Sequence, residues 1–212
     1  MNPVQIFYNH PYFENLELTN PFLEYLEREQ QNIKKTIKGG KVLDIGCGNG
    51  RSTEILSEIA DDVIGIDFSE RLLEQAGKRL SGRTNVQLFY EDAKNTHFDD
   101  SSFDYVVMLW NTFGNLYNAR DQVLSESKRI LRLEGQLLMS VLSERVLPDY
   151  LQMLKQNGLV ITQYDENYVF LREGLVSERF SREKLEKICR ANGLTPGIEK
   201  LTDISYWCKV RK

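Results

Sequence analysis

The residues with the clearest chemical potential are the glycines of segment 42–50, which reads Val-Leu-Asp-Ile-Gly-Cys-Gly-Asn-Gly. An aliphatic run typical of a buried strand ends there, and an amphipathic helix is predicted directly after it. Glycines at such a bend let the backbone turn sharply and let a ligand lie against bare peptide, where a Cβ atom would collide. In an open parallel sheet, ligands bind beyond the carboxyl ends of the strands. The segment therefore predicts a site for a nucleoside-sized cofactor above Gly46–Gly50.

The spacing of these glycines distinguishes between cofactors. A dinucleotide-binding turn has the pattern Gly-x-Gly-x-x-Gly. Counted from Gly46 the sixth position is Arg51, and counted from Gly48 it is Thr53, so that pattern is absent. The phosphate-binding pattern Gly-x-x-x-x-Gly-Lys-Ser/Thr is absent as well. The acidic Asp44 just before the turn would oppose a phosphate group but suits a cationic amino-acid group.

Five segments in register resemble the class I S-adenosylmethionine-dependent methyltransferases. Val42–Gly50 resembles the family's first motif, and the later segments are similar to the ends of its second, third and fourth strands and to the turn before its fifth. Those later segments are 63–70, 91–93, 103–109 and 130–135. The likeness covers about residues 40–142, with a weaker match over 181–210.

This resemblance implies an α/β fold: a doubly wound, mostly parallel, seven-stranded Rossmann-like sheet with an antiparallel last strand and a small rim insertion. It implies a core of residues 39–142 and 181–212. Residues 1–38 are then a helical cover segment, and residues 143–180 are an insertion of a helix plus a β-hairpin that covers the substrate. A purely structural role of both extra segments stays open.

The resemblance also implies roles for individual residues in binding S-adenosylmethionine, which becomes S-adenosylhomocysteine as the product. Gly46 and Gly48 form the turn against the adenosyl and methionine parts, and Asp44 holds the ammonium group unless it only caps the loop. Asp67 stands 19 residues after Gly48, close to the offset of about 20 for an acid that binds ribose hydroxyls. It could instead cap the next helix. The remaining predicted cofactor residues are Cys47, Phe68, Asp92, Ala93 and Leu109.

Acceptor residues are less well defined by the sequence. Trp110 and Asn111, after the fourth predicted strand, and the aromatic Tyr8 and Tyr12 near the N-terminus are candidates for contact with the acceptor. Segment 109–115, Leu-Trp-Asn-Thr-Phe-Gly-Asn, is similar to the glycine and sarcosine type of small-molecule N-methyltransferases. No catalytic residue is assigned, because positioning alone can supply about 7–11 kcal/mol in such a displacement.

Helical periodicity and capping signals predict the elements that position these residues. Asn20 and Pro21 predict a helix start, and the apolar stripe that follows runs to Ile37. Ser69 predicts the cap of a helix that ends before Ser81. Further helices are predicted over 119–131, 147–154 and 181–193, strands over 86–90, 105–109 and 137–142, and an antiparallel closing strand over 206–210.

The two histidines and the acidic pairs are not predicted to bind metal. His97 is expected to be a packing residue whose ring has a partner, and His10 belongs to the aromatic N-terminal stretch. Asp99 and Asp100 are expected in an exposed turn without a third oxygen ligand.

Composition limits the function classes. The 212 residues are 41% apolar and 27% charged, with a net charge of −4, so a nucleic-acid partner is disfavoured. Three widely spaced cysteines fit neither a zinc site nor a disulfide framework, and no signal peptide or apolar run of about 18 residues is present. We therefore expect a cytoplasmic monomer or homodimer that does not contact a membrane.

Three functions remain from the sequence. The favoured one is transfer of a methyl group to nitrogen or oxygen of an acceptor, a small molecule before an RNA or a protein. The second is a non-catalytic subunit that binds S-adenosylmethionine or supports a partner. The third, an oxidoreductase on a similar sheet, is disfavoured by the glycine spacing.

Overall fold

The computed structural model describes residues 16–172 and 174–212, so the predictions for Tyr8, His10 and Tyr12 lie outside the described residues. The main sheet has seven strands in the order β3-β2-β1-β4-β5-β10-β9. All neighbouring pairs from β3 to β5 are parallel, and β10 runs antiparallel to both β5 and β9. The predicted Rossmann-like sheet with its antiparallel last strand is confirmed. The strands are β1 (Lys41–Ile45), β2 (Asp62–Asp67), β3 (Val86–Tyr90), β4 (Phe103–Met108), β5 (Leu131–Leu142), β9 (Thr195–Thr202) and β10 (Ser205–Arg211).

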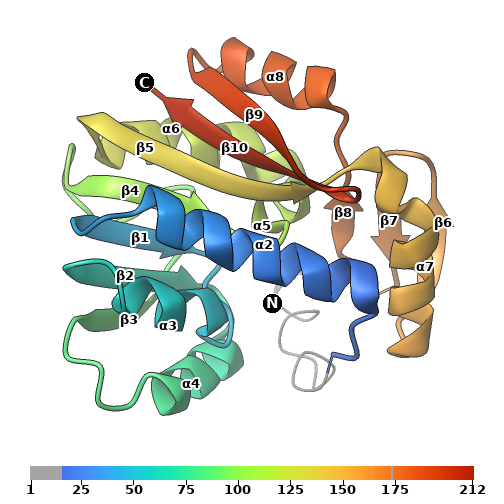
Figure 1. Cartoon of the computed structure of the whole chain (residues 1–212), viewed down its shortest axis with the longest axis horizontal. Coiled ribbons are helices and arrows are strands. Elements are labelled where there is room, and N and C mark those ends of the chain that lie inside the picture. The colour runs from blue at the N-terminus through green and yellow to red at the C-terminus, as the bar shows by residue number, and fades with distance from the viewer. Residues whose placement is uncertain (1–15, 173) are drawn as a thin grey trace.

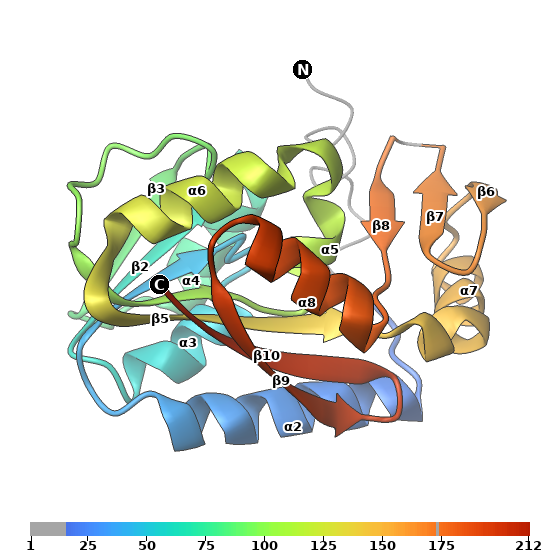
Figure 2. The ribbon, with the colours of Figure 1, turned by 90° about the horizontal axis from the view of Figure 1, so that it is seen from above.

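Helices cover both faces of this sheet, because the buried strands carry apolar side chains on both sides. Figure 2 shows α2 and α3 on one face and α6 and α8 on the opposite face. The helices are α2 (Asn20–Thr36), α3 (Arg51–Ser57), α4 (Glu70–Arg79), α5 (Thr112–Asn115), α6 (Arg120–Ile130), α7 (Leu147–Gln156) and α8 (Arg182–Ala191), with short 3-10 turns η2 (Tyr117–Ala119) and η3 (Glu144–Val146).

Alternating side chains of the parallel strands divide the core into two layers. Val42 pairs with Val63 in register, and both pack with Ile33 of α2 and Leu56 of α3. The next residue, Leu43, points to the other layer, which contains α6 and α8 residues. Because successive side chains of a strand point to opposite faces of the sheet, each strand packs one face against α2 and α3 and the other against α6 and α8.

A second, three-stranded sheet lies beyond the carboxyl end of β5, next to α7 (Figure 1). Its strands are β6 (Ile161–Tyr164), β7 (Tyr168–Leu171) and β8 (Val176–Glu178), all antiparallel. The predicted helix and hairpin are present in this segment, and β6 adds a third strand to the hairpin. A third apolar cluster joins α7 and β7 to Phe22 and Tyr25 of α2.

A buried ionic cluster connects the second sheet to the main fold. Glu178, at the end of β8, is fully buried and pairs with Arg120 of α6 and with Lys184 of α8, 2.7 Å away. The hydroxyl of Tyr168 on β7 donates to the same carboxylate at 3.1 Å. A carboxylate with several donors is the form in which a charge is tolerated in a protein interior.

Local signals in the sequence set the helix ends closely. The Ser69 side chain accepts a hydrogen bond from the Leu72 amide at 3.3 Å, as its predicted capping role requires. Helix α2 begins one residue earlier than predicted, with Thr19 rather than Asn20 at the N-cap, and the Thr19 side chain makes no capping hydrogen bond.

The three cysteines are free and buried.

Candidate functional site

The loop between β1 and α3 turns through three glycines, all with positive φ. At Gly46, a Cβ atom would lie 2.7 Å from Cγ2 of Thr112, and at Gly50 it would lie 3.1 Å from Cα of Ala76. A Cβ at Gly48 would meet nothing within 4 Å. The first and third glycines thus permit close packing, whereas Gly48 has φ +54° and faces open space. Only the second glycine leaves room for a ligand against the backbone.

Asp67 ends β2 directly beside this loop and holds it in place. One carboxylate oxygen accepts the Gly48 amide and the other accepts the Ser69 amide, each at 2.9 Å. The residue is only 7% exposed. Burial raises the pKa of Asp67 to about 6, although these amide hydrogen bonds act in the opposite direction.

Asp44 lies beneath the loop in the core of the sheet. Its Oδ2 accepts the hydroxyls of Ser52 and Thr53 at 2.7 and 2.8 Å, which ties β1 to the start of α3. Its Oδ1 has no hydrogen-bond partner among the described residues. Burial raises the pKa of Asp44 to about 6. In the Asp44 side chain, Oδ2 therefore caps the loop and Oδ1 remains able to accept a further hydrogen bond.

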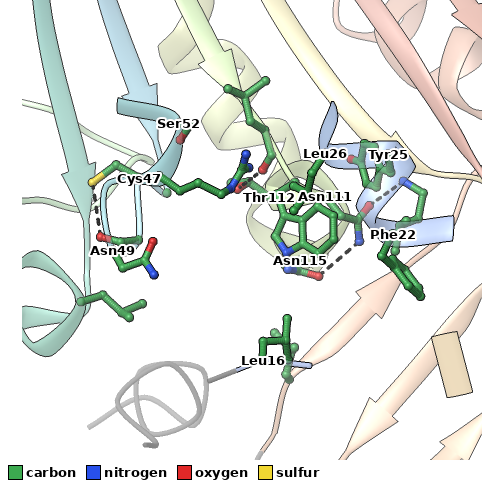
Figure 3. Close-up of a pocket in the computed structure, with 18 of the residues that line it drawn as sticks. Leu16, Phe22, Tyr25, Leu26, Cys47, Asn49, Ser52, Asn111, Thr112 and Asn115 are labelled. Carbon is green, nitrogen blue, oxygen red and sulfur yellow. Dashed lines mark hydrogen bonds between the residues drawn. The ribbon is translucent and has the colours of Figure 1, made fainter. Parts of the chain in front are cut away.

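A cavity of about 310 Å³ begins at this loop and continues toward α7. That volume is at the lower end of the usual range for small-molecule sites. Figure 3 shows Cys47 and Asn49 on one side of it, Phe22 and Tyr25 on the other, and Asn111 and Thr112 between them. The cavity thus spans the carboxyl edge of the main sheet and reaches the third apolar cluster.

The floor between the two ends is built by Trp110 and Asn111, which both have left-handed backbone conformations with φ of +51° and +59°. Such conformations cost free energy in residues with a side chain and persist where the surroundings hold them. Here the Trp110 amide donates to Glu29 at 2.7 Å, and the Asn111 amide donates to the Ser140 carbonyl at 3.1 Å. The indole ring stacks on Tyr25 with centroids 5.0 Å apart.

Glu29 of α2 organises this floor from below. Its fully buried carboxylate accepts the Trp110 amide, the Ser140 hydroxyl and the Arg51 guanidinium, the last at 2.8 Å. Arg51, at the start of α3, also lies over the indole ring of Trp110 at 5.9 Å. The Glu29 carboxylate therefore holds both the Arg51 guanidinium and the backbone of Trp110 in place.

Sequence reasoning missed Glu29, Arg51 and Tyr25. A signal for Glu29 existed, because residues 22, 25, 29 and 33 share one helical face and 29 is its only charged member. An ionisable residue inside an apolar stripe predicts a buried partner.

The structure brings most of the predicted residues together. Eight of them line the cavity, namely Gly46, Cys47, Gly48, Asp67, Phe68, Leu109, Trp110 and Asn111. The side-chain amide of Asn111 accepts from the Leu142 amide at 3.0 Å and donates to the Ser177 hydroxyl at 3.2 Å, so it also joins β5 to β8.

Three predicted residues do not line the cavity. Asp44 lies below the loop, whereas Asp92 and Ala93 lie in the turn after β3. Asp92 is exposed and accepts the Lys94 amide at 3.0 Å, while its other oxygen pairs with the Lys94 ammonium at 3.1 Å.

His97 has a partner, as expected, but belongs to the surface. Its ring pairs with Glu91 at 2.6 Å and contacts Phe89 and Phe98, while its side chain stays 54% exposed. In the described part of the chain, no group of three or more His, Cys, Asp or Glu side chains is arranged to hold a metal ion. None of the described helices has the length and apolar character needed to span a membrane.

Comparison with known proteins agrees with this arrangement. Residues 42–135 match the model of a family described as a methyltransferase domain. Over 121 residues the chain is 39% identical to a demethylmenaquinone methyltransferase of Staphylococcus epidermidis, which covers 55% of this chain and 48% of the relative. The chain thus spans about half the length of the curated relatives it matches.

Solved structures share the whole fold at lower identity. A protein from Pyrococcus horikoshii has a TM-score of 0.74 and 24% identity, covering 95% of both chains. DhpI in complex with S-adenosylhomocysteine has a TM-score of 0.76 and 17% identity, covering 99% of this chain and 95% of that one. Sheet order, glycine loop and fold together define an α/β protein with a doubly wound, Rossmann-like sheet. The match over residues 42–135 identifies a methyltransferase domain in this chain, in line with its resemblance to the class I S-adenosylmethionine-dependent methyltransferases.

Proposed function

We propose that this protein binds S-adenosylmethionine at the glycine loop and moves its methyl group to nitrogen or oxygen of a small-molecule acceptor. The observation that carries this proposal is the continuous cavity, which has the Gly48–Asp67 pair at one end and the Trp110 floor beyond it. The methyl donor and the acceptor then share one cavity, which an in-line displacement requires.

The residues around the loop fit this cofactor in two independent ways. Oδ1 of Asp44 is a buried acceptor without a partner in the described residues, which suits an ammonium group directly or through water. Gly48 offers open backbone where a side chain would otherwise stand. Asp44 lies beneath the loop and does not line the cavity, so we propose that this contact is made through water or after a local shift of the loop.

Each residue then has a role in the proposal. Asp67 accepts the ribose hydroxyls, and Phe68 packs against the adenine. Cys47 and Leu109 contribute apolar walls beside the loop. The roles of Asp92 and Ala93 require the adenine to reach the turn after β3, since neither residue lines the cavity.

When bound, S-adenosylmethionine would supply a methyl group on a positively charged sulfur. The lone pair of the acceptor would form the new bond to carbon, and the electrons of the broken C–S bond would stay on sulfur. The proton of the acceptor would pass to water. The protein supplies positioning, with the glycine loop at one end of the cavity and the Trp110 ring beyond it. No side chain is required as a covalent partner.

A small-molecule acceptor is favoured over a macromolecule. The cavity has a volume of about 310 Å³, which suits a small molecule, and the net charge of −4 does not favour a polyanion. The Staphylococcus relative is a demethylmenaquinone methyltransferase, and its small-molecule acceptor supports the same class. The non-catalytic subunit is the remaining alternative, in which the cofactor binds and no acceptor is methylated.

Calorimetry with S-adenosylmethionine and, separately, with NAD tests the cofactor. We expect heat of binding and a raised melting temperature with the first and neither with the second, because a ligand stabilises the folded state it binds. Release of S-adenosylhomocysteine over a panel of metabolites then separates an enzyme from a binding subunit. Binding of NAD alone would overturn the proposal.

Asp67→Ala should weaken S-adenosylmethionine by 10-fold or more, since it removes two charge-assisted hydrogen bonds worth about 1.5–3 kcal/mol each at most. Asp62→Ala provides the matched control, because Asp62 is exposed at the other end of the same strand. The fold of each variant is checked by its melting temperature. Unchanged affinity in a folded Asp67→Ala protein would remove the ribose assignment.

A further inference from the structure

The far end of the cavity has a chemical character of its own. It lies between α2, α7 and the loop before β8, and its walls are aliphatic or aromatic. The members that line it are Leu18, Phe22, Tyr25, Leu26, Trp110, Leu142, Tyr150, Met153, Leu154, Leu159 and Leu175. Such a lining binds through apolar contact and ring stacking rather than through charge.

The two charged side chains that line the described part of the cavity lie beside the glycine loop and over the Trp110 ring. Among the described residues that line the cavity, only Arg51 and Asp67 are charged. Asp67 stands beside the glycine loop and already accepts two amides. Arg51 is held by the Glu29 carboxylate at 2.8 Å. Both charges therefore already have partners within the protein.

The polar atoms of the far end are engaged within the protein. The Tyr25 hydroxyl donates to Ser140 at 3.0 Å, and the Tyr150 hydroxyl is hydrogen-bonded to Ser177. The Asn111 amide is used by β5 and β8, as described above. An ionised molecule placed here would lose its water without gaining a partner, which is strongly unfavourable.

We propose that the acceptor is an uncharged molecule with a flat ring, which packs against the Trp110 floor between α2 and α7. This inference deepens the proposed function and rests on it. It also disfavours a glycine-like or sarcosine-like acceptor, which the short likeness of residues 109–115 suggests, because such an amino acid carries two full charges. The ring of Trp110 is stacked on Tyr25, is in edge contact with Phe22 and has the Arg51 guanidinium over it at 5.9 Å, and the part of the ring that lines the cavity is the contact surface for the ligand.

Three probes with the same ring and different charge test this proposal: 2-naphthol, which is neutral at neutral pH, 2-naphthoate and 2-naphthylmethylammonium. Each is titrated by calorimetry into the full chain, with and without saturating S-adenosylhomocysteine. We expect 2-naphthol to bind at least tenfold more tightly than either charged probe. Equal or tighter binding of a charged probe, or no binding of 2-naphthol, overturns the proposal.

Binding of S-adenosylhomocysteine is measured in the same experiment, so a failure of the proposed acceptor can be told from a failure of the proposed function. If it binds and 2-naphthol does not, the ring-bearing acceptor is wrong and the proposed function survives. If S-adenosylhomocysteine itself does not bind, the proposed function fails, whatever the naphthalene probes do.

Variants locate the probe in the cavity. Met153 is 4% exposed on α7, and Met153→Phe should lower 2-naphthol affinity at least tenfold while leaving S-adenosylhomocysteine affinity within twofold. Leu133→Phe is the matched control, because Leu133 is 78% exposed on β5 and does not line the cavity. Met153→Ala enlarges the cavity and should retain 2-naphthol binding. It provides a second test of the site if Met153→Phe does not fold. Unchanged 2-naphthol affinity in folded Met153→Phe places the probe elsewhere and overturns the proposal.

Discussion

Two buried carboxyl groups beside the glycine loop make the protein sensitive to pH. Burial raises the pKa of Asp44 and of Asp67 from 3.8 to about 6 each. An acid whose pKa is raised on folding binds its proton more tightly in the folded chain. Its contribution to the free energy of unfolding is therefore full below about pH 3.8 and is lost as the pH rises through about 6.

Asp67→Asn should reveal this contribution by difference. The variant keeps an uncharged side chain at every pH, so its free energy of unfolding, minus that of the wild type, should rise by up to about 3 kcal/mol from about pH 4 to about pH 7. Urea denaturation at a series of pH values measures it. The same difference for exposed Asp62→Asn should stay nearly constant. A flat difference for Asp67→Asn would contradict the raised pKa.

Glu29 is the residue whose loss should cost the most stability at this site. Glu29→Ala leaves the Arg51 cation and the Ser140 hydroxyl without their acceptor and removes one of the two acceptors of the Trp110 amide, so we expect a loss of about 2–4 kcal/mol in the free energy of unfolding. The figure is set below that of a fully buried pair because the Arg51 side chain is 29% exposed. Glu24→Ala on the same helix, whose side chain is 57% exposed, should cost at most about 0.5 kcal/mol. Equal effects of the two substitutions would show that the buried pair contributes nothing special.

At the scale of elements, two helix starts provide a matched comparison. Ser69 caps α4 through the Leu72 amide, whereas Thr19 stands at the N-cap of α2 without a capping hydrogen bond. Ser69→Ala should lower the free energy of unfolding by about 1 kcal/mol, and Thr19→Ala should change it much less. Thermal or urea unfolding of both variants measures the contrast. A larger loss for Thr19→Ala would mean that capping does not explain it.

The elements show where sequence reasoning succeeds and where it stops. Ser69 was predictable because capping is a local interaction between neighbouring residues. The partners of Glu29 were not, since Ser140 and Trp110 come from strand ends far along the chain. The face of α2 that carries Glu29 is predictable from periodicity, but the hydrogen bonds it makes depend on the packed sheet.

The whole molecule follows the same division. The order of the main sheet could be predicted because five motifs occur in register and parallel strands with helical crossovers have few arrangements. The segments of the second sheet were predicted as two or three strand-like runs over residues 159–180 that include a hairpin, whereas the pairing of β6 with β7 depends on contacts that the sequence pattern does not specify. Whether residues 143–180 cover the substrate remains a prediction, as do the roles of Tyr8 and Tyr12.

All three thiols are buried, so the rate at which each is alkylated measures how often its surroundings unfold. Cys47 lies in the glycine loop, whereas Cys189 and Cys208 lie together between α8 and β10. Alkylation requires exposure, so labelling rates read the local and global opening of the two regions separately. Mass spectrometry after timed alkylation should show that S-adenosylhomocysteine protects Cys47 more strongly than the other two. Equal protection of all three cysteines would mean that both regions open only when the entire chain unfolds.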